Sequence, residues 1–276
     1  MLRRLLTALP LAAVAALLGG VLAAPSASAY TGPPNSMASM GDSITRAFNS
    51  CGWYVDCTSR SWSTGDDTYV NSHRLRIRAI NPYFGAAYND ARSGAKASDM
   101  AGQASTAVSQ RVQYVTMEIG ANDACTSSEA SMTSVATFRS QIDAALGTLK
   151  GGLPDSKVFI ASVPDIKRLW FIGKDSGTAR FYWSLGGICQ SMLANPTSTN
   201  QADIDRRNRV QQRVIGFNSQ LAQACAAYGT NCKFDNNAVF NYPFVLSQVS
   251  GWDYFHPNRD GQRVLAQVTW AAGFVW

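Results

Sequence analysis

Residues 112–123, VQYVTMEIGAND, decide the fold class of this chain. Residues 112–119 are rich in β-branched and aromatic side chains, which predicts a buried strand. The Gly120-Ala121-Asn122-Asp123 sequence that follows predicts a turn where the strand ends. Residues 133–149 then place apolar side chains at helical spacing. A strand that leads through a turn into an amphipathic helix is typical of stacked βα units.

The same alternation extends along the chain in both directions. Further strands are predicted at residues 36–40, 84–90, 158–163 and 233–235. Further helices are predicted at residues 69–80, 98–109, 203–228 and 258–272. Residues 165–200 are rich in aromatic side chains and glycine but have no steady period, so no element is predicted there. The pattern predicts one α/β domain with a mainly parallel five-stranded sheet.

The amino terminus has the pattern of a secretory signal peptide. Arg3 and Arg4 precede an apolar run over residues 5–24, and Ala27-Ser28-Ala29 supplies small residues for cleavage. A membrane anchor is the alternative, but Pro10 interrupts the run, and the residues that follow it are rich in serine and alanine rather than charged. We therefore predict a signal peptide over residues 1–29 and a secreted, extracellular domain over residues 30–276, without a stable membrane anchor.

The charge of the chain argues against a nucleic-acid partner. The formal net charge is +6, and the basic residues are scattered apart from two clusters. The clusters are Arg74, Arg76 and Arg78, and Arg206, Arg207 and Arg209. We interpret both as solvated helix faces, because a nucleic-acid interface would show a localised basic surface with interleaved aromatic side chains.

Six cysteines in an exported chain predict disulfide bonds. Cys51 and Cys57 lie close together in the sequence, as do Cys225 and Cys232, so each pair could close a small loop. This choice leaves Cys125 to pair with Cys189, although other pairings stay open. The chain has no CxxC motif and only two histidines, so we expect no metal and no cofactor.

Several polar residues follow predicted strands or precede the last predicted helix. Ser43 follows the first strand, Gly94 the second and Asn122 the third, while Asp253 and His256 precede the last helix. Ligands bind at the carboxyl ends of the strands in an open parallel sheet. Acyl transfer needs a serine, an imidazole that takes its proton, a carboxylate that orients the imidazole, and donors for the oxyanion.

These segments resemble the four conserved blocks of the SGNH (GDSL-type) hydrolase superfamily, in the order of that family. The matching segments are Gly41-Asp42-Ser43-Ile44, Ser93-Gly94, Gly120-Ala121-Asn122-Asp123 and Asp253-Tyr254-Phe255-His256. The single departure in the first block is Ile44 in place of leucine. The resemblance implies a flavodoxin-like three-layer α/β/α sandwich.

The resemblance also implies a role for each matching residue. Ser43 would be the nucleophile, His256 the general base and Asp253 the residue that orients His256. The oxyanion hole would be formed by the backbone N–H groups of Ser43 and Gly94 and by the side-chain amide of Asn122. Asp42 and Asp123, next to these motifs, are interpreted as structural hydrogen-bonding residues.

The flanking residues are similar to those of lipases and phospholipase-B-like members of the superfamily. We therefore expect a monomeric esterase or lipase that hydrolyses small-molecule or lipid esters through an acyl-enzyme. A carbohydrate acetylesterase with the same machinery, a phosphodiester substrate, and a catalytically inactive secreted binding module are the alternatives.

Aromatic residues are the candidates for the wall of a substrate pocket. Phe255 lies beside His256, and Trp170 and Trp183 lie in the aromatic segment that has no steady period. Packing in the core is the alternative for each of them. His73, the only other histidine, lies in a basic helical stretch, where a surface or packing role is expected.

Overall fold

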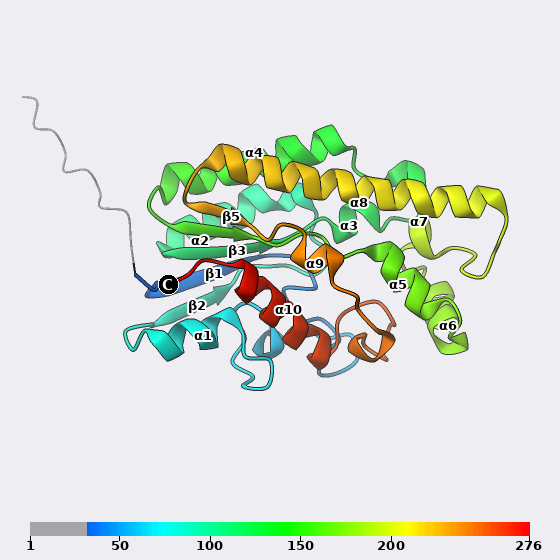
Figure 1. The fold of residues 1–276 in the computed structure, drawn as a ribbon, viewed down its shortest axis with the longest axis horizontal. Helices are drawn as coiled ribbons and strands as arrows, with labels where there is room; N and C mark the ends of the chain where they lie inside the picture. Colours follow the sequence, from blue (N-terminus) through cyan, green and yellow to red (C-terminus); the bar gives the residue numbers. More distant parts are fainter. Residues whose placement is uncertain (1–31) are drawn as a thin grey trace, which may run out of the picture.

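A sheet of five parallel strands forms the centre of the computed structural model, which describes residues 32–276 (Figure 1). The strands are β1 (Ser36–Gly41), β2 (Ala86–Asn89), β3 (Tyr114–Glu118), β4 (Lys157–Ile160) and β5 (Cys232–Phe234). Their order, β2-β1-β3-β4-β5, is that of the flavodoxin-like folds. The predicted α/β class and five-stranded sheet are confirmed. The predicted signal peptide lies outside the described residues.

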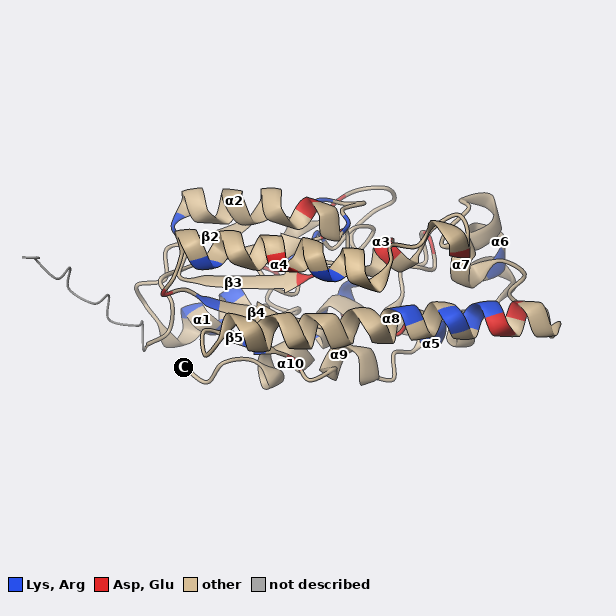
Figure 2. Ribbon diagram, turned by 90° about the horizontal axis from the view of Figure 1, so that it is seen from above, with Lys and Arg blue, Asp and Glu red and all other residues tan. Residues whose placement is uncertain are grey.

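Helices cover both faces of this sheet and make three layers. The helices of these layers are α1 (His73–Ile80), α2 (Met100–Gln110), α4 (Val135–Gly152), α8 (Gln201–Tyr228) and α10 (Arg259–Ala272). On one face α2 packs on α4 and α4 on α8, and these three helices lie side by side in Figure 2. On the opposite face lie α1 and α10 (Figure 1). Among the described residues, no helix combines the length and the apolar character that crossing a bilayer requires.

Apolar strands explain why the sheet is covered on both faces. Every residue of β3 is buried, and β1 is buried from Met37 onward. Strands that are buried on both faces read as nearly continuous apolar runs, which is why residues 112–119 give the clearest strand signal in the sequence. Predicted and observed ends differ by a few residues: the helix predicted from residue 69 begins at His73, because the Ser72 side chain caps it by accepting the Leu75 N–H.

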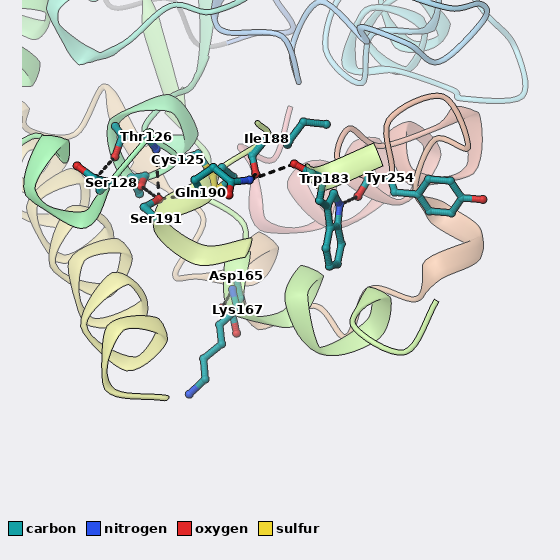
Figure 3. Close-up of a disulfide and its surroundings, with 12 residues drawn as sticks. Cys125, Thr126, Ser128, Asp165, Lys167, Trp183, Ile188, Gln190, Ser191 and Tyr254 are labelled. Atoms are coloured by element: carbon teal, nitrogen blue, oxygen red, sulfur yellow. Dashed lines mark hydrogen bonds between the residues drawn. A yellow bond between two sulfur atoms is a disulfide. The ribbon is translucent and has the colours of Figure 1, made fainter. Parts of the chain in front are cut away.

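Three short helices occupy the segment in which the sequence predicted no element. They are α5 (Ile166–Gly173), α6 (Gly177–Leu185) and α7 (Gln190–Leu193). They lie beyond the carboxyl end of the sheet, beside the part of α8 that extends past it (Figure 1). A disulfide between Cys125 and Cys189 connects this group to the chain that follows α3 (Ala121–Ala124), as Figure 3 shows.

The remaining cysteines pair as their spacing favoured. Cys51 bonds to Cys57, and Cys225 at the end of α8 bonds to Cys232 at the start of β5. Each of these two bonds closes a short loop.

The interpretation of Arg206 and Arg207 as part of a solvated face is wrong. Their basic side chains lie on the part of α8 that extends past the sheet (Figure 2), but Arg207 is only 2% exposed. Its guanidinium lies 4.5 Å from the ring centroid of Trp170 and donates to the carbonyl of Ser198. Arg206 donates to the carbonyls of Gln190, Ser191 and Ala194. The two arginines therefore donate to backbone carbonyl groups of α7 and of the residues that follow it, up to Ser198.

Candidate active site

The turn after β1 presents Ser43. Gly41 has a φ of +148°, and a Cβ at this position would lie 2.4 Å from the carbonyl oxygen of Glu118 on the neighbouring strand. The chain can therefore take this path only with glycine. Asp42 then accepts the Ile44 N–H at 2.8 Å, which closes a tight turn around Ser43. Ser43 is 6% exposed at the carboxyl edge of the sheet.

A closed loop before α10 presents Asp253 and His256. An antiparallel bridge between Val249 and Pro257 joins the two ends of the loop, and the Ser250 N–H donates to the carbonyl of His256 at 2.8 Å. Inside the loop, Asp253 Oδ1 accepts the backbone N–H groups of Phe255 at 2.9 Å and His256 at 3.0 Å. The three-residue offset of the DxxH motif thus places the carboxylate beside the imidazole.

The three side chains form a continuous hydrogen-bonded relay. His256 Nε2 lies 2.7 Å from Ser43 Oγ, and His256 Nδ1 lies 2.6 Å from Asp253 Oδ2. A carboxylate only accepts, so Nδ1 carries the proton and Nε2 is free to accept the serine O–H. Burial by itself would raise the pKa of Asp253, but the hydrogen bond and charge of His256 and the two backbone N–H groups lower it. Asp253 is therefore held as a carboxylate.

Asn49 is a second donor to the same carboxylate oxygen. Its Nδ2 lies 2.6 Å from Asp253 Oδ2, across 204 residues of sequence. Its neighbour Phe48 lies with its ring edge against His256, at 5.0 Å between ring centroids. Sequence reasoning missed both residues, because neither belongs to a recognised block and their only signal is closeness to Ser43 in the sequence.

Three N–H donors near Ser43 lack an acceptor among the described residues. The backbone N–H groups of Ser43 and Gly94 make no hydrogen bond there, and Asn122 uses one N–H of its amide, to the carbonyl of Ala95 at 2.9 Å. The Arg92 N–H donates to the carbonyl of Gly41. Gly94 therefore lies between Arg92, which is hydrogen-bonded to the end of β1, and Ala95, which is hydrogen-bonded to Asn122. These are the donors expected for an oxyanion hole.

Two cavities adjoin the relay and share Phe255 as a wall. The first is apolar and is lined by Ile44, next to Ser43, and by Ala121, next to Asn122. Its other apolar walls are Pro164, Ile166, Leu169, Ile172, Phe244, Val249 and Pro257. The second cavity is wider and borders His256 and Asn122. Its aromatic walls are Phe48, Trp53, Tyr54, Tyr182, Trp252 and Phe255.

Two of the three predicted substrate-binding aromatics do not line these cavities. Trp183 is 1% exposed, and its Nε1 donates to the carbonyl of Tyr254 at 2.8 Å, beneath the DxxH loop (Figure 3). Trp170 lies in a separate hollow with Arg207 and donates to the carbonyl of Pro196. Both indoles bond to backbone carbonyls instead of lining the site, so their predicted role was wrong. Of the three, only Phe255 lines the two cavities beside the relay.

Other predicted residues have structural positions. Asp123 accepts the Ala97 N–H and the Thr133 hydroxyl, and His73 is fully buried between Tyr114 and Thr269. Within residues 32–276 no group of three or more histidine, cysteine or acidic side chains is arranged to hold a metal ion.

Comparison with known protein families identifies the chain. The sequence profile described as GDSL-like lipase/acylhydrolase matches residues 37–268, which include all four motif segments. The chain belongs to the GDSL-like lipase/acylhydrolase family. This GDSL-family chain matches no curated protein.

Solved structures share the fold of this GDSL-family chain at low sequence identity. An acetyl-xylooligosaccharide esterase from Geobacillus stearothermophilus is 17% identical with a TM-score of 0.53, over 88% of this chain and 95% of the esterase. An extracellular lipase from Streptomyces rimosus is 18% identical with a TM-score of 0.52, over 87% of this chain and 100% of the lipase. A phospholipase A1 from Streptomyces albidoflavus is 16% identical with a TM-score of 0.51, over 87% and 100%. These likenesses establish the fold and leave the substrate open.

Proposed function

We propose that this chain is a secreted serine hydrolase that cleaves the carboxylic esters of acyl lipids through an acyl-enzyme on Ser43. The observation that carries this proposal is the continuous relay, with 2.7 Å between Ser43 and His256 and 2.6 Å between His256 and Asp253. A hydroxyl within hydrogen-bond reach of an oriented imidazole is an activated nucleophile. Membership of a family of lipases and acylhydrolases agrees with this chemistry.

The mechanism follows from the direction of the hydrogen bonds. His256 Nε2 takes the proton of Ser43 Oγ as the oxygen attacks the ester carbonyl carbon, and Asp253 stabilises the imidazolium that forms. The N–H groups of Ser43, Gly94 and Asn122 stabilise the oxyanion. His256 then gives its proton to the leaving alcohol as the C–O bond breaks. A water molecule hydrolyses the acyl-enzyme by the same route and restores the Ser43 hydroxyl.

The apolar cavity supports an acyl substrate. It begins at Ile44 and Ala121, next to the nucleophile and the expected oxyanion donor, and it continues along one face of α5. An acyl chain in this cavity would be removed from water, which contributes about 0.8 kcal/mol for each buried methylene group. The ester alcohol would then occupy the wider cavity on the other side of Phe255.

Acetylated carbohydrate is the second candidate substrate. The aromatic walls of the wider cavity, Trp53, Tyr54, Tyr182 and Trp252, favour it because flat ring faces suit sugar rings. Such a substrate would fill the wider cavity and leave the apolar one to an acetyl group. Rates on acetyl-xylan and on esters of increasing acyl length separate the two candidates.

Export is also part of the proposal. Three disulfide bonds within the described residues are typical of proteins that fold in an oxidising compartment. The signal-peptide pattern of the first 29 residues agrees with them.

Covalent labelling tests the proposed function. An organophosphonate should label Ser43, and the Ser43→Ala variant should lose labelling and at least ~1,000-fold in kcat/KM on a short-chain ester. Ser156→Ala is the matched control, because Ser156 is 7% exposed, close to the 6% of Ser43, and its hydroxyl donates to the carbonyl of Val112. A folded Ser43→Ala enzyme that keeps full ester hydrolysis would refute the proposal.

A further inference from the structure

Asn49 occupies a backbone conformation and a hydrogen-bonding position that few residues can satisfy. Its φ is +59°, in the left-handed region that only glycine and, less readily, asparagine and aspartate favour. It is 3% exposed. Its amide oxygen accepts the Tyr54 N–H at 2.6 Å, and its amide nitrogen donates to Asp253 Oδ2 at 2.6 Å. The side chain therefore joins two separate parts of the chain.

Both backbone groups of Asn49 also form hydrogen bonds. The Asn49 N–H donates to the carbonyl of Val55 at 2.9 Å, and its carbonyl accepts the Ser250 hydroxyl at 2.8 Å. The disulfide between Cys51 and Cys57 closes the loop that contains Val55. Asn49 thus connects a covalently closed loop to the loop before α10 at two points, Ser250 and Asp253.

The carboxylate of Asp253 is saturated with donors. Oδ1 accepts two backbone N–H groups, while Oδ2 accepts Asn49 Nδ2 and His256 Nδ1, both at 2.6 Å. The two backbone N–H groups come from the same loop as Asp253 and move with it. Asn49 is the one donor to this carboxylate, among the described residues, that comes from a distant part of the sequence. It fixes the carboxylate relative to β1 and Ser43.

We propose that Asn49 is a positioning residue that acts through Asp253, holding Oδ2 where it accepts the His256 N–H and sharing the negative charge of that oxygen. The inference rests on the proposed function, because the relay must be catalytic for the positioning to affect turnover. Without Asn49, Asp253 loses an anchor, and more of its charge acts on His256. The imidazole then holds its proton more tightly and is oriented less well.

Histidine NMR tests this role without relying on activity. The chain has only two histidines, so the ring signals of His256 can be followed through a pH titration. The second histidine is an internal reference, because burial and then the charge of Arg76 lower the pKa of His73 to about 3. The variant is Asn49→Gly, which removes the amide and still allows the left-handed backbone. Asn49→Ser, whose side chain is too short to reach Asp253, serves if the glycine variant fails to fold.

In Asn49→Gly, the titration midpoint of His256 should move up by about 0.5–1 pH unit. The acid limb of kcat/KM on a short-chain ester should move with it, and the maximum should fall about 10-fold. A residue with a merely structural role would lower activity equally at every pH and leave the midpoint in place.

Asn81→Gly is the matched control. Asn81 is also a buried asparagine, its amide oxygen accepts the Tyr83 N–H at 3.0 Å, and its amide nitrogen donates to Asn35 Oδ1. It lies at the end of α1, away from the relay, so its loss should leave the His256 midpoint unchanged. A folded Asn49 variant with the wild-type midpoint would overturn the inference. Failure of the proposed function would appear separately, as activity retained in Ser43→Ala.

Discussion

Glu118 carries a carboxyl group at the end of β3 with no hydrogen-bond partner for either oxygen among the described residues. The residue is 1% exposed. Burial raises its pKa well above the ordinary value, and the nearby charges of Asp42 and Asp235 add to the shift. Asp42 shows the same effect: burial raises its pKa to about 7, against the opposing Ile44 N–H and the charge of His256. Burial therefore favours the neutral forms of Glu118 and Asp42, at the ends of the two strands next to Ser43.

The Glu118→Met variant should be more stable than the wild type, and its advantage should be larger at neutral pH than in acid. An acid with a raised folded-state pKa contributes its full stability below the unfolded-state pKa, here about 4.5, and loses it as the pH rises through the folded-state value. Methionine removes this loss without leaving a polar atom unpaired. Urea unfolding should show a gain in the free energy of unfolding at pH 7 that becomes smaller toward pH 4. Parallel stability curves for the two proteins would contradict the expectation.

At the scale of elements, the start of α10 holds the loop that presents Asp253 and His256 in place. Asn258 caps this helix by accepting the Gly261 N–H at 3.0 Å. The same side chain donates to the carbonyls of Ser247 at 2.8 Å and Val249 at 3.2 Å, at the beginning of the loop that presents Asp253 and His256. The Asn258 side chain therefore caps α10 and also fixes the start of the loop that carries Asp253 and His256.

The Asn258→Ala variant should lose both stability and activity. Loss of the cap and of two bonds to carbonyl groups should lower the free energy of unfolding by about 1–3 kcal/mol. The kcat on a short-chain ester should fall about 10-fold, because the loop is less well held. Ser134→Ala, which removes the cap of α4 and its bond to the Thr137 N–H, is the control. It should cost about 1 kcal/mol with kcat retained; equal loss of kcat in both variants would contradict the role given to Asn258.

At the scale of the whole molecule, the apolar cavity exists only because distant segments meet at one end of the sheet. Its walls come from the turn after β1, from α3, from α5 and from residues 244–257. Ile166, Leu169 and Ile172 share one face of α5 and line the cavity, and Arg168 fastens the helix by donating to the carbonyl of Phe244 at 2.8 Å. If the cavity holds the acyl chain as proposed, the packing of α5 sets the size of the acyl group that fits.

A larger side chain in the cavity should lower the rate on long acyl esters and leave the rate on short acyl esters nearly unchanged. In Leu169→Trp, the indole should occupy space in the cavity and lower kcat/KM on an octanoyl ester at least ~10-fold. A tenfold loss corresponds to about 1.4 kcal/mol of binding energy. The rate on an acetyl ester should change less than about twofold. Leu185→Trp is the control, because Leu185 is 72% exposed and borders the other cavity. Equal losses on both esters in Leu169→Trp would show that the cavity does not hold the acyl chain.

Local patterns were enough to predict the five strands and the helices that cover the sheet, and the family motifs indicated the residues of the relay. Buried runs such as residues 112–119 and the helical spacing of residues 133–149 report their own secondary structure, and parallel strands bring their carboxyl ends to one edge. For that reason the sequence alone assigns Ser43 and His256 to one site, although 213 residues separate them.

The sequence by itself determined the fold class, the order of the motifs and the cysteine pairs that spacing favours. The tertiary structure alone decided that Asn49 reaches Asp253, that Arg207 and Trp183 are buried, and that α5 lines a cavity. The physical reason is that periodicity and turn chemistry act over a few neighbouring residues. Loop contacts instead depend on which distant carbonyl and carboxyl groups still need a donor once the sheet and its helices have packed.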